Sequence, residues 1–194
     1  MCIRDRPNEI PQMSVGLLLD ESGSMCSCDR CTYARSSAII LYDFCKALHI
    51  PVTVYGHSTS GNSVELYSYA EFESIDNDDK YRMMDIAARG SNRDGAALRF
   101  VAEQLVKRPE EVKILILVSD GQPAAPGYYG SAAEEDLRGI KQEYRRKGVL
   151  FIAAAIGEDK QNIERIYGDS FMDITDLNQL PVKLTAAVKR HMRV

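Results

Sequence analysis

The sequence lacks the features that would place the protein in a membrane or on nucleic acid. No apolar run approaches the roughly 18 residues of a membrane-spanning helix. The net charge is −4, and there is no basic stripe of the kind that binds nucleic acid or an anionic membrane. Residues 1–11 contain no apolar core of a secretory signal. We therefore expect a cytoplasmic protein with neither nucleic-acid nor membrane partners.

Cysteine is scarce outside one short segment. Five cysteines are present, and an odd number without a signal peptide argues against a disulfide framework. Cys26, Cys28 and Cys31 lie close enough in sequence to share a soft metal ion or an iron–sulfur cluster. No fourth ligand or second Cys/His pair is evident, so reduced, unligated thiols are favoured. Cys45 falls in the apolar pattern of a helix and is expected in the core.

Length and composition indicate one globular domain. The 194 residues are 45% hydrophobic and 27% charged, ordinary values for a folded domain that buries a sizeable core. Residues 1–11 fit nothing downstream, and we expect them to be a non-native or fragment-edge leader, so that the natural protein begins earlier. Residues 12–194 are expected to form the single domain.

Apolar runs and helical periodicities alternate along the chain. The alternation predicts a Rossmann-like, doubly wound α/β fold with a mostly parallel six-stranded sheet and helices on both faces. The run at 64–70 alternates instead, which predicts one antiparallel edge strand. The expected strands are 14–19, 51–56, 64–70, 112–118, 149–157 and 171–174, and the longer expected helices are 32–48, 94–107, 132–147 and 176–191.

Polar loops follow two of the buried strands. Asp20, Ser22 and Ser24 are spaced by two at the carboxyl end of the first strand, where open α/β sheets place their ligands. Asp120 ends the strand at 112–118, so both carboxylates could share one rim. Such hard oxygens suit a small cation such as Mg²⁺. The alternative is a polar turn that caps a helix.

Three motifs stand out in this order: DESGSM at 20–25, GSNRDGAAL at 90–98 and LILVSDGQP at 115–123. Together they resemble the von Willebrand factor A (VWA) domain with a metal-ion-dependent adhesion site. The resemblance implies that Ser22 and Ser24 ligate Mg²⁺, or Mn²⁺ or Ca²⁺, directly. Asp20 and Asp120 would then hold the cation through water.

The middle loop departs from the family pattern. Asn92 stands where the family usually has threonine, and Asp94 is an alternative carboxylate two places on. An open position on the cation would take an Asp or Glu side chain from a protein partner.

Softer similarity points to bacterial intracellular members of the family. The segments YAR at 33–35, LYDFC at 41–45 and VYGH at 54–57 resemble proteins related to the cobalt chelatase accessory subunit and the nitric-oxide-reductase activation protein. Such proteins carry this domain at the C-terminus and work with a MoxR-type AAA+ ATPase in metal insertion or enzyme maturation. This resemblance implies a binding module rather than an enzyme.

An enzymatic alternative uses Asp20 as the nucleophile of a Mg²⁺-dependent phosphatase or phosphotransferase. Against it, Ser22 replaces the second acid of such enzymes, and no lysine stands at a matching strand end. A third reading makes the cysteine cluster a redox or metal-delivery site.

Several polar and aromatic residues near the predicted rim have two readings each. We expect His57 to be a hydrogen-bonded structural residue in a polar turn, although it could ligate a cation or sense pH. Asp78 is expected to cap a short helix that runs through Met84. Tyr128 and Tyr129 either anchor a partner or pack their own loop down.

Overall fold

The computed structural model describes residues 12–74, 76–121, 123–156 and 160–174, together with 179, 182–183 and 185–186. The predicted leader at 1–11 lies outside this part of the chain, as does most of the predicted helix at 176–191. Among the helices formed by the described residues, none is both long and apolar enough to cross a lipid bilayer.

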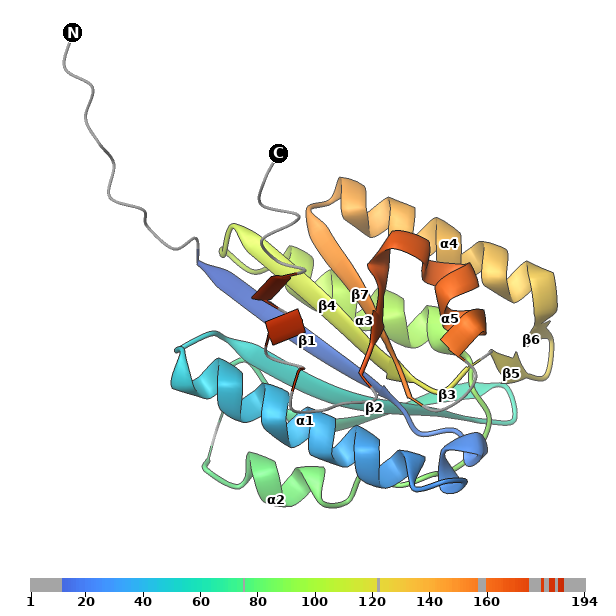
Figure 1. Ribbon diagram of the computed structural model, residues 1–194, viewed down its shortest axis with the longest axis horizontal. Coiled ribbons are helices and arrows are strands. Elements are labelled where there is room, and N and C mark those ends of the chain that lie inside the picture. The colour runs from blue at the N-terminus through green and yellow to red at the C-terminus, as the bar shows by residue number, and fades with distance from the viewer. Residues whose placement is uncertain are drawn as a thin grey trace, which may run out of the picture.

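A six-stranded sheet in the order β3-β2-β1-β4-β7-β8 forms the centre of the molecule (Figure 1). Its strands are β1 Met13–Asp20, β2 Val52–Ser60, β3 Ser63–Ala70, β4 Val112–Ser119, β7 Val149–Ala155 and β8 Phe171–Asp173. Within the described residues, β2 and β3 pair antiparallel and the other neighbours pair in parallel. The predicted mostly parallel sheet with one antiparallel edge strand is confirmed.

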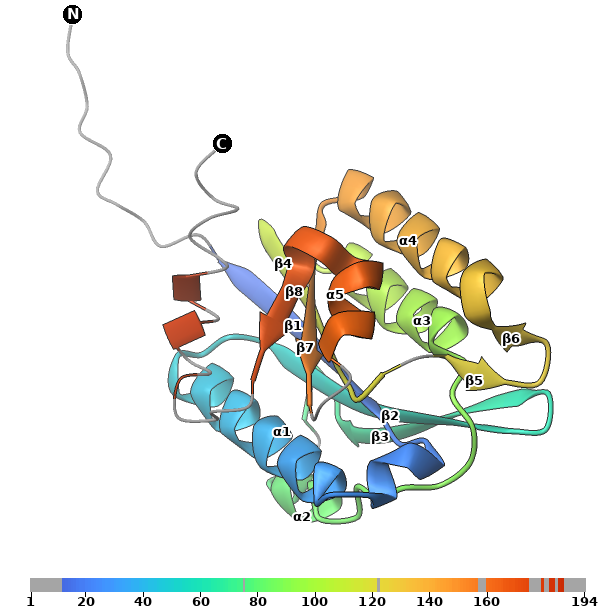
Figure 2. The same cartoon turned by 45° about the vertical axis from the view of Figure 1, so that its right-hand side comes forward.

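Helices cover both faces of the sheet, as a second view shows (Figure 2). One face carries α1 Arg30–Ala47 and α2 Asp79–Met83, and the other carries α3 Asp94–Val106, α4 Gly130–Arg146 and α5 Lys160–Tyr167. The smaller elements are η1 Gly23–Cys26, the β5 Ala124–Ala125 and β6 Tyr128–Tyr129 hairpin, and η2 Gly168–Ser170. The doubly wound α/β architecture is therefore as predicted.

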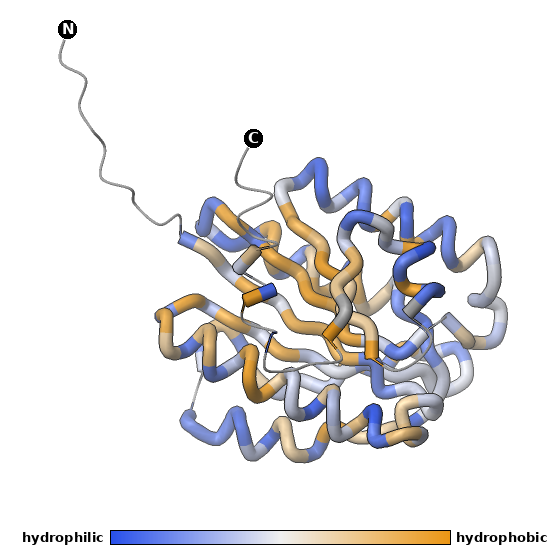
Figure 3. The backbone as a smooth tube through the Cα atoms, viewed as in Figure 1, coloured by the Kyte–Doolittle hydropathy of each residue, from blue (hydrophilic) through white to orange (hydrophobic). Residues whose placement is uncertain are grey.

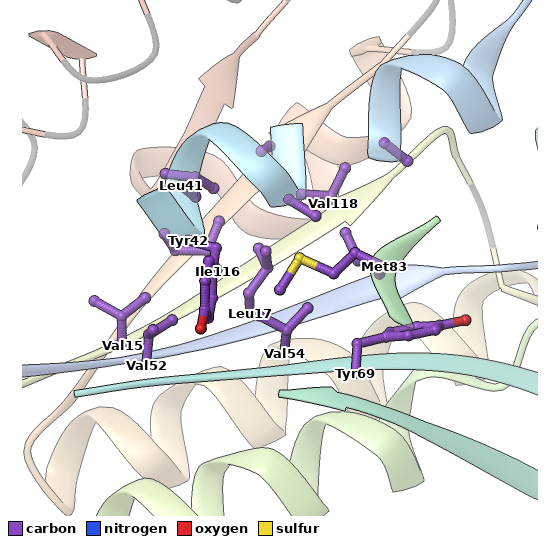
Figure 4. Packing of buried hydrophobic residues seen from close by; sticks show 14 of the residues in the cluster. Val15, Leu17, Leu41, Tyr42, Val52, Val54, Tyr69, Met83, Ile116 and Val118 are labelled. Atoms are coloured by element: carbon purple, nitrogen blue, oxygen red, sulfur yellow. The ribbon is translucent and has the colours of Figure 1, made fainter. Parts of the chain in front are cut away.

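Two apolar cores lie between the sheet and its helices, because successive side chains of β1 point to opposite faces. Leu17 joins the cluster under α1 and α2, whereas Leu18 joins the cluster under α3 and α4. The central strands β1, β4 and β7 are strongly hydrophobic (Figure 3). Leu41 and Met83 lie over the sheet on the α1 side (Figure 4). Burying each such side chain contributes about 1.5–3 kcal/mol.

Gly16 lets helix α3 approach the central strand closely. A Cβ atom at Gly16 would lie 2.7 Å from Cγ1 of Val101 and 3.0 Å from Cδ1 of Leu105. A glycine inside a strand commonly marks such a close approach. The contact packs the middle and the last turn of α3 directly against β1.

Two local predictions differ from the structure. Strand β2 runs to Ser60, because β3 pairs with its polar half through to Ser63, so His57 is a strand residue and was wrongly placed in a turn. Asp78 occupies the N-cap position of α2 but makes no side-chain capping bond. The neighbouring Asp79 is the acid that is fixed in place, because it accepts hydrogen bonds from Tyr42 and Ser74.

Candidate metal site

The carboxyl ends of β1 and β4 place two polar loops at one edge of the sheet. Leu19 pairs with Val118 in the parallel ladder, so Asp20 and Asp120 leave neighbouring strands at nearly the same level. Segment η1 and the β5–β6 hairpin lie at this edge in both views (Figures 1 and 2). The open α/β fold thus brings together loops that are a hundred residues apart, as expected.

Asp20 joins three segments of the edge. Its side chain is fully buried, and Oδ1 accepts a hydrogen bond from the Ser22 backbone N–H at 2.8 Å. Oδ2 accepts hydrogen bonds from Nδ2 of Asn92 at 2.7 Å and from the Ser119 hydroxyl at 2.8 Å. The carboxylate therefore holds the loop after β1, the middle loop and the end of β4 in one arrangement.

Two serine hydroxyls and a second carboxylate lie beside Asp20. The Oγ atoms of Ser22 and Ser24 are 2.9 Å apart, and the Ser24 hydroxyl donates to Oδ1 of Asp120 at 3.1 Å. Arg30 donates from a guanidinium nitrogen to Oδ2 of Asp120 at 2.7 Å. The structure thus brings together the predicted residues of the first and third loops.

The two candidate ligands of the middle loop, Asn92 and Asp94, have different contacts. The Asn92 amide reaches Asp20, and its Oδ1 is buried without a hydrogen-bond partner among the described residues. Asp94 is also buried, and its Oδ1 likewise makes no hydrogen bond of good geometry there, but it lies 3.2 Å from Nε2 of His57 as an ion pair. Asn92 therefore contacts the predicted cation-binding residues directly, whereas Asp94 pairs with a histidine one strand away.

Negative charge is crowded at this edge. Burial, followed by the charge of Asp94, raises the pKa of Asp20, and burial together with the charge of Asp20 raises the pKa of Asp120. Burial lowers the pKa of His57, but the hydrogen bond and charge of Asp94 outweigh it and hold that pKa above its usual value. The carboxylates would be stabilised in their charged form by an added cation.

A cation at this edge would depend on hydroxyl and amide oxygens as well as on carboxylates. Among the described residues, no group of three or more His, Cys, Asp or Glu side chains is arranged to hold a metal ion. This applies to the acids of the edge and also to Cys26, Cys28 and Cys31, which are free thiols. The soft-metal reading of the cysteines therefore has no support in the described structure.

A partly buried ion pair that was not predicted joins the first loop to Arg89, the residue just before the middle loop. Glu21 is fully buried and accepts hydrogen bonds from Nε of Arg89 at 2.7 Å and from the Tyr69 hydroxyl at 2.6 Å. The Arg89 backbone N–H also donates to the Glu21 carbonyl at 2.7 Å. Gly56 makes room for this acid, since a Cβ there would lie 1.7 Å from Oε1 of Glu21. A glycine inside a predicted strand was the only sequence signal.

The two tyrosines after Asp120 have separate surroundings. Tyr128 is half-buried and donates its hydroxyl to Oδ2 of Asp136 at 2.8 Å, so it packs the hairpin against α4. Tyr129 is 69% exposed. The packing alternative holds for the first tyrosine, and the second remains available to a partner.

The chain is similar to proteins of known family and fold. A family model described as the cobalamin biosynthesis protein CobT VWA domain matches residues 80–192. The uncharacterized protein YojO of Bacillus subtilis is 26% identical over 188 residues, which are 90% of this chain and 29% of that protein. Protein NorD of Brucella suis is 34% identical over 97 residues, which are 48% of this chain and 15% of that protein. The chain thus spans less than a third of either curated relative.

Solved structures share the fold at low sequence identity. The PilB minor pilin from Streptococcus sanguinis superposes with a TM-score of 0.65 at 15% identity, covering 97% of this chain and 63% of the pilin. A von Willebrand factor type A protein from Catenulispora acidiphila gives 0.61 at 17% identity, covering 88% of this chain and 40% of that one. At these identities the likeness concerns the fold alone.

Proposed function

Because the chain belongs to the CobT family of VWA domains, we propose that it is the interaction module of an enzyme-maturation or metal-insertion system and that it binds its protein partner through Mg²⁺. The relationship to a cobalamin biosynthesis domain and to NorD supports the module reading. The use of Mg²⁺ is a proposal from the geometry of the candidate site.

The observation that carries the proposal is the meeting of oxygen donors from two distant loops at one edge of the sheet. The Ser24 hydroxyl contacts both Ser22 and Asp120. An arrangement of hydroxyls with few carboxylates suits a small hard cation that keeps part of its water shell. Ca²⁺ prefers more oxygen ligands, which favours Mg²⁺ or Mn²⁺ here.

The residues of the edge fit such a cation. In the proposed site, Ser22 and Ser24 ligate it through their hydroxyls, and Asp20 and Asp120 orient its waters. Oδ1 of Asn92 has no hydrogen-bond partner among the described residues and is a further oxygen ligand. We favour it over Asp94, because Asn92 contacts Asp20 whereas Asp94 lies beside His57. A buried acceptor without a partner costs about 1–3 kcal/mol, and a ligand that supplies the missing contact removes that cost.

Binding a partner's carboxylate is the chemistry that such a cation would supply. The protein's own residues would position the partner's carboxylate and neutralise its charge. Arg30 already holds one oxygen of Asp120, and its guanidinium would add to the attraction for an incoming Asp or Glu side chain. Exposed Tyr129 on the neighbouring hairpin offers a flat, amphipathic contact of the kind enriched at protein interfaces.

The proposed partner is a MoxR-type AAA+ ATPase of the cytoplasm. The basis is the family relationship together with the resemblance of segments 33–35, 41–45 and 54–57 to intracellular family members. We further propose that the chain has no catalytic activity of its own and acts as an accessory module.

The geometry does not favour Asp20 as an enzymatic nucleophile. Attack on a phosphoryl group needs an accessible carboxylate oxygen at near-contact distance. Asp20 is fully buried, and its two oxygens together accept three hydrogen bonds. Those contacts suit a residue that organises the loop.

Metal-dependent capture of partners tests this function. The native chain, a Ser22→Ala/Ser24→Ala double variant and a Ser27→Ala control would be incubated with a bacterial extract in Mg²⁺ or in EDTA. Ser27 is an exposed serine of the same segment. We expect the native chain and the control to recover an AAA+ ATPase in Mg²⁺ alone, and the double variant to lose it. Equal recovery in EDTA, or by the double variant, would exclude a metal-dependent contact.

A further inference from the structure

Two cysteines flank a tight reversal of the chain next to the candidate metal site. Cys26 is the last residue of η1, and Cys31 is the second residue of α1. Between them, the Arg30 backbone N–H donates to the Ser27 carbonyl at 3.1 Å. Cys28 and Asp29 inside this turn both have left-handed backbones, with φ of 53° and 57°. The chain therefore folds back on itself, and the two cysteines stand on its two arms.

The thiols differ in their exposure. Cys26 is exposed and Cys31 is half-buried, whereas Cys28 is exposed at the tip of the turn. Burial raises the pKa of Cys31, and among the smaller contributions Arg35 lowers it while Cys26 raises it. Cys26 is thus within electrostatic reach of Cys31. Cys45 lies in the core, where burial raises its pKa to about 12, so it serves as an unreactive internal reference.

We propose that Cys26 and Cys31 form a reversible dithiol–disulfide site whose reaction partners are low-molecular-weight disulfides such as oxidised glutathione. The exposed Cys26 thiolate attacks one sulfur of the small disulfide, breaks its S–S bond and releases one thiol. The Cys31 thiolate then attacks the Cys26 sulfur of the mixed disulfide and releases the second thiol. The two protein thiols are oxidised to one disulfide, the small disulfide is reduced to two thiols, and the protons of the protein thiols pass to the released thiolates.

The pairing follows from the turn and not from sequence distance alone. Cys26 and Cys28 are separated by one residue, and their bond would have to close within the turn itself. Cys28 and Cys31 are joined by Asp29 and Arg30, of which Asp29 is left-handed and Arg30 begins the helix. Disulfides need Cα atoms within about 7 Å, and Cys26 and Cys31 directly flank the two residues, Ser27 and Arg30, that the hydrogen bond of the reversal joins.

Closing the bond would constrain a residue of the candidate site. Arg30 lies inside the loop from Cys26 to Cys31 and holds Asp120, and Ser24 precedes that loop by two residues. Oxidation would therefore fix the position of the guanidinium beside Asp120. The dithiol chemistry itself is independent of the proposed Mg²⁺ function and can be tested without any metal.

Thiol mapping in glutathione buffers tests the proposal. The full chain would be equilibrated at graded ratios of oxidised to reduced glutathione, quenched by alkylation and digested, and its peptides would be identified by mass spectrometry. We expect a Cys26–Cys31 bond that forms with increasing oxidised glutathione and disappears with dithiothreitol, while Cys45 stays reduced. The Cys28→Ser variant should form the same bond to the same extent.

Other outcomes would overturn the assignment. A bond that joins Cys28 to either neighbour, or its loss in Cys28→Ser, would place the reactive pair elsewhere. Stable mixed disulfides without an internal bond would show that the thiols do not meet. Circular dichroism of Cys26→Ser and Cys31→Ser would show whether each remains folded, and a folded Cys31→Ser variant should stop at the glutathione adduct on Cys26.

Discussion

Replacing Arg89 by methionine should destabilise the fold far more than replacing an exposed arginine. The variant keeps much of the aliphatic stem but removes the charge that pairs with Glu21 at 2.7 Å. The Glu21 side chain is 0% exposed and that of Arg89 is 35% exposed. The hydrogen bond to Glu21 holds the pKa of Arg89 well above its usual value. The variant would remove the cation that pairs with Glu21 among the described residues.

The expected loss in the free energy of unfolding is about 3 kcal/mol. Removing one partner of a buried pair typically costs about 3–5 kcal/mol. The lower end applies because solvent screens the exposed third of Arg89. The Tyr69 hydroxyl also continues to donate to Glu21.

Urea unfolding followed by circular dichroism measures this loss. The matched control is Arg145→Met, because Arg145 and its partner Asp169 are both 59% exposed and such pairs contribute about 0–1 kcal/mol. In a Glu21→Gln background, Arg89→Met should cost less, since no buried charge is then left alone. If Arg89→Met costs no more than Arg145→Met, the ion pair does not hold the two loops together and the reasoning fails.

Three further predictions concern buried residues of the fold and of the candidate site. Gly56→Ala should destabilise the fold by about 3 kcal/mol in the same urea assay, because its Cβ would overlap Glu21. The control is Gly139→Ala in α4, where a Cβ would have nothing within 4 Å and should stabilise the fold by about 0.5–1 kcal/mol. Equal effects of the two substitutions would refute the close approach of Gly56 to Glu21. Asp79→Asn should cost about 2 kcal/mol at neutral pH: burial raises the pKa of Asp79, but hydrogen bonds from Tyr42, Ser74 and Arg82 hold it below its ordinary value of 3.8. This contribution is present above that value and is lost as the pH falls through the lower folded-state pKa, so the difference between native and variant chains should shrink in acid, and a pH-independent difference would contradict the role of the charge. Asp20→Ala should abolish Mg²⁺-dependent partner capture while the circular dichroism spectrum stays folded, and an unfolded variant would mean that the carboxylate is structural.

Much of the fold could be predicted because its signals are local. The continuous apolar runs at 14–19 and 112–118 have the composition of parallel strands buried on both faces. The alternation at 64–70 marked the antiparallel edge strand, and each helix has its own periodicity. The carboxyl ends of two such strands then placed Asp20 and Asp120 at one edge.

The side-chain contacts of the site could not be predicted, because they join residues that are distant in sequence. The polar half of β2 resembles a turn, yet Ser58 accepts a hydrogen bond from the Gly90 backbone N–H at 2.8 Å, and His57 lies beside Asp94. Arg30 is separated from Asp120 by 90 residues. Ser119 belongs to the motif at 115–123 but has no role in the sequence prediction, although its hydroxyl donates a hydrogen bond to Asp20. Local patterns carry no information about such pairs.

Direct titration of Mg²⁺ tests the central claim most closely. Isothermal titration calorimetry would compare the metal-free native chain with the Ser22→Ala/Ser24→Ala double variant and with the Ser27→Ala control, each confirmed to be folded by circular dichroism. We predict saturable binding of one Mg²⁺ by the native chain and by the control, and no binding by the double variant. Binding that survives in the double variant, or no binding by the native chain, would contradict the proposed metal site.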